Sequence, residues 1–175
     1  MSFYYIVLFF HITGALGLFV SLGLEWLIVH NSTRVTTNSQ AVQWIGLFNI
    51  LPRVFVSSAI LILISGIYMS VEIWGINSWV ISGFVLYLAL AVFGGVIVSK
   101  KIGTISGELK SERENLSESF LKKIKSPLIS ESLKIRTLLA LSIIFIMTIK
   151  PDWTVTLTVI SVALIAGLFL ARILK

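Results

Sequence analysis

Two ionisable side chains, His11 and Glu25, lie within the first long apolar run of this chain and are its first candidates for chemistry. An ionisable group inside a membrane is energetically expensive, so each one is a functional hypothesis by default. The imidazole of His11 could ligate haem iron or relay a proton, and the alternative is a structural histidine bonded to a neighbouring carbonyl or hydroxyl. His11 and Glu25 are 14 positions apart, about 21 Å along a helix, so they cannot form a direct acid–base couple.

Glu25 lies near the inner end of the first apolar run, and Arg53 opens the second run at the same end. Because charges inside a membrane pair with one another, we predict an intramembrane ion pair between Glu25 and Arg53. A proton-handling Glu25 is the alternative. His11 and His30 lie about 28 Å apart along one helix, so they cannot ligate the same iron.

Several kinds of chemistry are excluded by what the sequence lacks. There is no cysteine, which removes disulfides, thiolate catalysis and cysteine-ligated metals. No phosphate-binding loop, dinucleotide fingerprint, zinc-protease helix or nucleophile elbow is present. We therefore predict no metal site and cannot assign catalytic residues; the cofactor is unknown, with a haem held by His11 as the candidate.

Five apolar runs define the elements that position these residues. Charged residues make up only 13% of the chain, against about 25% in soluble domains, and a span needs about 20 apolar residues. We expect an all-α polytopic transmembrane bundle, one membrane domain over residues 1–175, with spans near 3–29, 53–73, 78–99, 135–149 and 153–171. The fourth run is short, so Lys134 and Arg136 are expected to snorkel to the interface and lengthen it.

The basic residues give this bundle an orientation. With the N-terminus outside and the C-terminus cytoplasmic, 13 of the 14 lysines and arginines fall on the cytoplasmic side, and only Lys150 lies outside. This matches the positive-inside bias of multi-pass proteins of the cell membrane. The net charge of +6 therefore indicates contact with the lipid bilayer and its anionic lipids at the cytoplasmic face, and not with nucleic acid.

The segment 100–134 is the one substantial stretch outside the apolar runs. It contains eight basic residues and five glutamates, with apolar residues at near-helical spacing. We expect a charged, partly helical cytoplasmic loop on the membrane surface, and a docking helix for a protein partner is the alternative.

Small residues mark the faces along which the spans should pack, since they let helices approach closely. We expect them to serve packing within one chain, and a dimer seam is the alternative. The residues are Gly14, Gly17, Gly94, Gly95, Ala163, Gly167 and Ala171.

The order of "HITGALGLF", "LPRVFVSSAILILISGIYM", a basic loop and "IMTIKPDW" resembles a family of small bacterial and archaeal integral membrane proteins of unknown function. That family is distantly similar to copper-resistance D-type proteins and to small membrane-type protoporphyrinogen oxidases, which bind haem through a histidine in the first span. The resemblance implies that His11 is the haem-side residue. The oxidases also use a lysine in a later span, which no lysine here matches, and only three methionines are present, which argues against copper handling.

Three functions follow from these patterns. The first is a non-enzymatic bundle that binds a partner or supports a membrane complex, favoured by the scarcity of polar groups inside the spans. The second is a haem-binding redox or porphyrin-handling protein that uses His11. The third is a small transporter or proton pathway, which is disfavoured because the prolines lie at the ends of the spans and not in their middle.

Overall fold

The computed structural model of the chain is all-helical, and it describes residues 3–92, 94 and 98–173. Within those residues the only extended pairing is an isolated bridge between Thr37 and Asn115. The elements are α1 (Phe3–Ser32), α2 (Asn38–Phe48), α3 (Leu51–Met69), the π-helical turn η1 (Ser70–Trp74), α4 (Ser78–Val92), α5 (Ser99–Leu109), α6 (Glu118–Ile124), α7 (Pro127–Ile149) and α8 (Trp153–Ile173).

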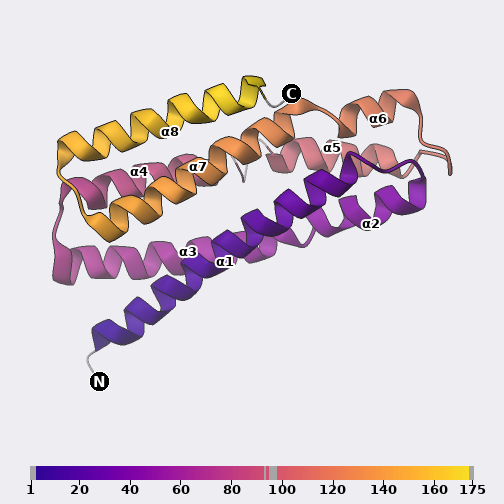
Figure 1. Cartoon of the computed structure of the whole chain (residues 1–175). Helices are drawn as coiled ribbons and strands as arrows, with labels where there is room; N and C mark the ends of the chain where they lie inside the picture. The colour runs from indigo at the N-terminus through magenta and orange to yellow at the C-terminus, as the bar shows by residue number, and fades with distance from the viewer. Residues whose placement is uncertain (1–2, 93, 95–97, 174–175) are drawn as a thin grey trace.

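The helices form rows that run back and forth along one direction (Figure 1). α2 leads into α3, α5 lies beyond the end of α4, and α6 leads into α7. We call the end with the η1–α4 and α7–α8 turns the tryptophan end, after Trp74, Trp79 and Trp153. We call the opposite end, which holds α2, α5 and α6, the charged end.

Three stretches in the described part of the chain are long and apolar enough to cross a membrane: Phe3–Ser32, Asn38–Trp74 and Glu118–Ile149. Two shorter apolar helices, Ser78–Val92 and Trp153–Gly167, accompany them. Large apolar side chains such as Phe9, Leu16 and Ile165 are more than 60% exposed. Apolar helices with exposed apolar faces are typical of proteins in contact with lipid.

The fourth predicted span differs most from the observed helix. The sequence suggested a short run over 135–149, whereas α7 begins at Pro127 and has 23 residues. Proline in the first turn costs no hydrogen bond, so Pro127 is a natural helix start. The predicted loop 100–134 is consequently α5, α6 and the first turns of α7.

Polar side chains set the other helix boundaries at the charged end. The Thr37 hydroxyl accepts a hydrogen bond from the Gln40 N–H at the start of α2, and Ser117 does the same for the Phe120 N–H at the start of α6. Such caps satisfy backbone donors that have no partner within the helix. Pro52 lies in the first turn of α3.

Lys150 closes the α7–α8 turn at the tryptophan end. It adopts a left-handed conformation with φ 54°, and its N–H bonds to the Ile146 carbonyl at 2.9 Å. Its ammonium lies 5.2 Å from the centre of the Trp74 ring and 5.1 Å from that of Trp79. A cation is attracted to the face of an aromatic ring, so this contact stabilises the exposed lysine at the tryptophan end of the bundle.

The buried apolar residues fall into two clusters along the bundle. One, toward the tryptophan end, centres on residues such as Leu22, Leu90 and Ile146 from α1, α4 and α7. The other lies at the charged end, where residues such as Ile45, Ile105 and Phe120 from α2, α5 and α6 pack together. The helices of the charged end thus have a core of their own.

Candidate functional site

A buried ion pair joins α1 to α7. The Arg136 Nη1 donates to the Glu25 Oε2 at 2.8 Å, and Nη2 donates to Oε1 in a second, short contact. Arg136 is 2% exposed and Glu25 7%. A two-point contact between guanidinium and carboxylate is the strongest and most directional form of such a pair.

This pair replaces the predicted one. The sequence pointed to Arg53 as the partner of Glu25, but Arg53 is exposed on the first turn of α3. Arg136 was expected at the end of a short span, from which it could reach water. Because α7 begins at Pro127, Arg136 lies nine residues, or about 13 Å, inside the helix. Arg136 is buried between the helices, so its charge requires an internal anion.

The sequence does contain a signal for this placement. Ile129, Leu133, Arg136 and Ala140 follow the spacing of one helical face, and all four are buried. The arginine therefore falls on an otherwise apolar stripe. The stripe can be recognised only if the helix is taken to begin at Pro127, because Ile129 and Leu133 precede the apolar run 135–149.

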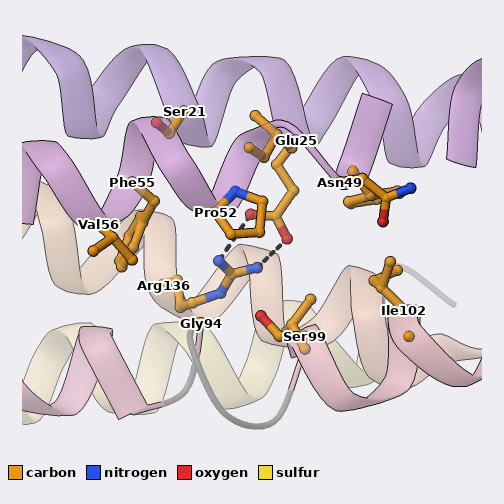
Figure 2. A pocket seen from close by; sticks show the side chains of 14 residues that line it. Ser21, Glu25, Asn49, Pro52, Phe55, Val56, Gly94, Ser99, Ile102 and Arg136 are labelled. Atoms are coloured by element: carbon orange, nitrogen blue, oxygen red, sulfur yellow. Dashed lines mark hydrogen bonds and ion pairs between the residues drawn. The ribbon is translucent and has the colours of Figure 1, made fainter. Parts of the chain in front are cut away.

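A cavity of about 240 Å³ lies beside the ion pair (Figure 2). Its walls come from α1, the α2–α3 junction, α5, Gly94 and α7. Most of the lining is apolar, and Glu25 and Arg136 are its charged members. The lining residues are Ser21, Glu25, Phe48, Asn49, Leu51, Pro52, Phe55, Val56, Gly94, Val98, Ser99, Ile102, Gly103 and Arg136.

The Nε atom of Arg136 is the nitrogen of this guanidinium that lacks a partner within the described residues. This buried Nε–H finds no acceptor in the described part of the chain, although both terminal nitrogens are used by Glu25. A buried donor without an acceptor costs about 1–3 kcal/mol. Gly94 lies against the same guanidinium, because a Cβ there would come within 3.1 Å of Nη1. Gly94 therefore leaves room for the guanidinium of Arg136.

His11 lies toward the tryptophan end, away from this cavity, and joins α1 to α3. Its Nδ1 is 3.0 Å from the Ser65 hydroxyl, which also bonds to the Leu61 carbonyl. The direction of the bond between Nδ1 and Ser65 depends on the tautomer of the imidazole. The ring also lies close to Gly66, where a Cβ would be 3.3 Å from its Cε1. His11 is thus held by contacts between two helices.

The predicted small residues lie at helix contacts where the structure describes them. A Cβ on Gly14 would be 2.9 Å from the Ser58 carbonyl oxygen, and one on Gly17 would be 2.2 Å from the Ser58 hydroxyl. Gly167 faces Ile135 of α7 at 3.3 Å, and Ala163 is buried. Gly95 and the side chain of Ala171 lie outside the described residues.

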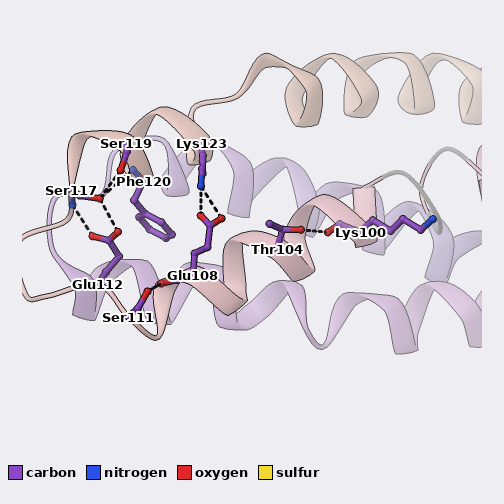
Figure 3. Close-up of polar contacts among 9 residues, drawn as sticks. All are labelled: Lys100, Thr104, Glu108, Ser111, Glu112, Ser117, Ser119, Phe120 and Lys123. Atoms are coloured by element: carbon purple, nitrogen blue, oxygen red, sulfur yellow. Dashed lines mark hydrogen bonds and ion pairs between the residues drawn. The ribbon is translucent and has the colours of Figure 1, made fainter.

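Polar contacts order the surface of the charged end (Figure 3). The Lys123 Nζ lies 2.7 Å from Glu108 Oε1, which ties α6 to α5. The Ser117 N–H and hydroxyl donate to Glu112 at 2.8 and 2.7 Å. These bonds, the backbone one first, hold the pKa of the Glu112 carboxyl below its usual value.

The fold and this site together define an all-helical protein with long apolar helices and a buried ion pair beside a cavity. No family model, curated protein or solved structure matches the chain. No group of three histidine, cysteine or acidic side chains that could hold a metal ion occurs in the ranges that the structure describes.

Proposed function

We propose that the chain is a multi-pass protein of the cell membrane with five spans, its N-terminus outside and its charged end in the cytoplasm. Support comes from the three long and two shorter apolar helices, and from the gathering of basic residues at the charged end, opposite Trp74, Trp79 and Trp153. Tryptophan belts and cytoplasmic basic residues are the usual anchors of membrane helices. Reporter fusions after residues 1 and 175 test the orientation, and a cytoplasmic signal at residue 1 refutes it.

We further propose that the protein is a non-enzymatic bundle whose charged end binds a protein partner in a membrane complex. One observation is central to this proposal: the charged end has a buried core of its own, built on Ile105, Phe120 and their neighbours. A disordered loop would have no need of such a core. A packed core instead holds its outer face in one shape, as a preorganised binding surface requires.

The charge of that face indicates the chemistry of the partner. Residues 100–134 have a net charge of +3, from eight basic residues and five glutamates. Lys110, Arg113, Lys122 and Lys125 are all exposed. Complementary charge speeds and orients protein association, so an acidic surface on the partner is expected.

Blue-native electrophoresis of gently solubilised membranes tests the partner proposal. The wild-type chain should migrate with a second protein, and Lys122→Glu with Lys125→Glu should release it. Lys150→Glu, at the opposite end of the bundle, is the control and should leave the complex intact. A wild-type chain that migrates alone contradicts the proposal.

A haem-binding redox or porphyrin-handling role of His11 is the second candidate, and the bond between Nδ1 and Ser65 supports it. Ligating histidines are usually oriented by a hydrogen bond from the nitrogen that faces away from the metal. The visible spectrum of protein expressed with ample haem is the test. The absence of a Soret band, or a band unchanged in His11→Ala, rules this role out.

A further inference from the structure

We propose that the cavity beside Glu25 and Arg136 binds one anionic phospholipid from the cytoplasmic leaflet. The proposal rests on the membrane placement given above, but not on the existence of a protein partner. The ligand would place an ester carbonyl on the Arg136 Nε–H, part of an acyl chain on the apolar wall and its phosphate at the mouth.

The shape of the cavity fits part of a lipid. Its volume is about 240 Å³. That is too small for a whole drug-sized ligand, for which pockets of about 300–1,000 Å³ are usual. Pro52, Phe55 and Val56 give one wall an apolar surface, and Pro52 and Val56 are exposed. An acyl chain could therefore enter from the lipid side at the start of α3.

The polar end of the cavity, at Glu25 and Arg136, is suited to a hydrogen-bond acceptor without a full negative charge. Glu25 already neutralises the guanidinium of Arg136, so a second full anion has little to gain beside it. The buried Nε–H of Arg136 has no acceptor among the residues that the structure describes, and Arg136 as a whole is 2% exposed. An uncharged carbonyl oxygen satisfies that donor without disturbing the ion pair, and every glycerophospholipid has one close to its headgroup.

Two basic residues that neighbour the cavity lining in the sequence would supply the positive charge that an anionic headgroup needs. Arg53 directly follows the lining residue Pro52, and Lys100 directly follows the lining residue Ser99. Both basic side chains are exposed. Basic pockets between spans on the cytoplasmic side are the usual places where anionic headgroups bind. Arg53, which does not pair with Glu25, would thus contact the lipid headgroup instead.

Two glycines on α5 provide a matched test. Gly103 lines the cavity, whereas Gly107 lies one helical turn further on and does not. A Cβ on either residue would meet no atom within 4 Å, so both positions accept a larger side chain. Gly103→Leu should fill the mouth of the cavity, and Gly107→Leu should leave it open while making the same change in helix propensity.

Native mass spectrometry of full-length protein released from nanodiscs of equal phosphatidylglycerol and phosphatidylcholine measures the bound lipid. Wild type and Gly107→Leu should retain phosphatidylglycerol, and Gly103→Leu should lose it. Equal retention in the two leucine variants overturns the proposal. So does equal retention of both lipids by the wild type, or displacement of the lipid by free glycerol 3-phosphate at low concentration.

Arg53→Gln and Lys100→Gln extend the test to positions where folding is not at risk. Each should lower the preference for phosphatidylglycerol about fivefold, the factor expected for one basic residue near an anionic surface. An unchanged preference in both refutes the placement of the phosphate. Because the measurement uses purified protein without a partner, its outcome is independent of the blue-native experiment.

Discussion

Replacing Arg136 with methionine should destabilise the bundle by about 3–5 kcal/mol, because it leaves the carboxylate of Glu25 buried without a counter-charge. Glu25 is only 7% exposed, and both of its oxygens are bonded to Arg136. In the folding equilibrium this loss is a factor of roughly a hundred to several thousand. Glu25→Leu should cost a similar amount, because it strands the guanidinium.

The double variant Glu25→Leu with Arg136→Met should behave differently. Replacing both partners of a buried pair by apolar residues is often neutral or stabilising. It also removes the Arg136 Nε–H, which has no acceptor in the described part of the chain. We therefore expect the double variant to lie within about 1 kcal/mol of the wild type or above it. The two single losses would then be strongly non-additive.

Unfolding in mixed micelles with increasing SDS, followed by tryptophan fluorescence, measures these free energies. The exposed pair between Glu108 and Lys123 is the control, since Lys123→Gln should cost no more than about 1 kcal/mol. Two single variants near wild-type stability would show that Glu25 and Arg136 are not held away from water. Additive losses in the double variant would show that they do not act as a pair.

Three further results follow from the packing and the polar contacts. Gly14→Ala should lower the free energy of unfolding by about 1–3 kcal/mol in the same assay, because its Cβ would lie 2.9 Å from the backbone of α3. The control is Gly23→Ala, whose Cβ meets no atom within 4 Å and should not destabilise the protein. Equal effects of the two variants would refute the contact. The lowered pKa of Glu112 means that its bonds to Ser117 stabilise the charged end above the usual glutamate value of 4.5 and that this contribution is lost as the pH falls through the folded-state pKa. Protection from hydrogen exchange at the start of α6, taken relative to the intrinsic rate at each pH, should therefore fall in acid in the wild type but not in Glu112→Gln, and an identical acid response contradicts this. Lys150→Met should lower the free energy of unfolding by about 0.5–1 kcal/mol and change the tryptophan emission, because it removes the ammonium beside the Trp74 and Trp79 rings. An unchanged emission spectrum would contradict that contact.

The helical class could be predicted from the sequence because the length and hydrophobicity of each apolar run are properties of that segment alone. Helix starts were predictable where a local signal exists, as with Pro52. The start of α7 was missed because residues 127–134 are more polar than the rest of the helix, so a search for apolar runs ended at residue 135. The same polar turns are helical because they pack in the charged-end core, through Ile129.

In the candidate site, Glu25 and its need for an ion pair could be predicted, but its partner could not. Burial of a charge in an apolar run pointed to Glu25 and to an ion pair, since such a charge needs a partner wherever it lies. The choice between Arg53 and Arg136 depends on which helix faces Glu25, and that is a property of the packing of three helices. The cavity is still less visible in the sequence, because its walls come from residues as distant as Ser21 and Arg136.

By itself, the sequence determined the composition of the spans, the uneven distribution of basic residues and the need of Glu25 for a counter-charge, because hydrophobicity and charge are properties of single residues and short windows. Only the tertiary structure decided that Arg136 meets this need, that a cavity lies beside the pair, and that the charged end has its own core. Each of these depends on the distances between segments far apart in the chain, which are set when the helices pack and not before.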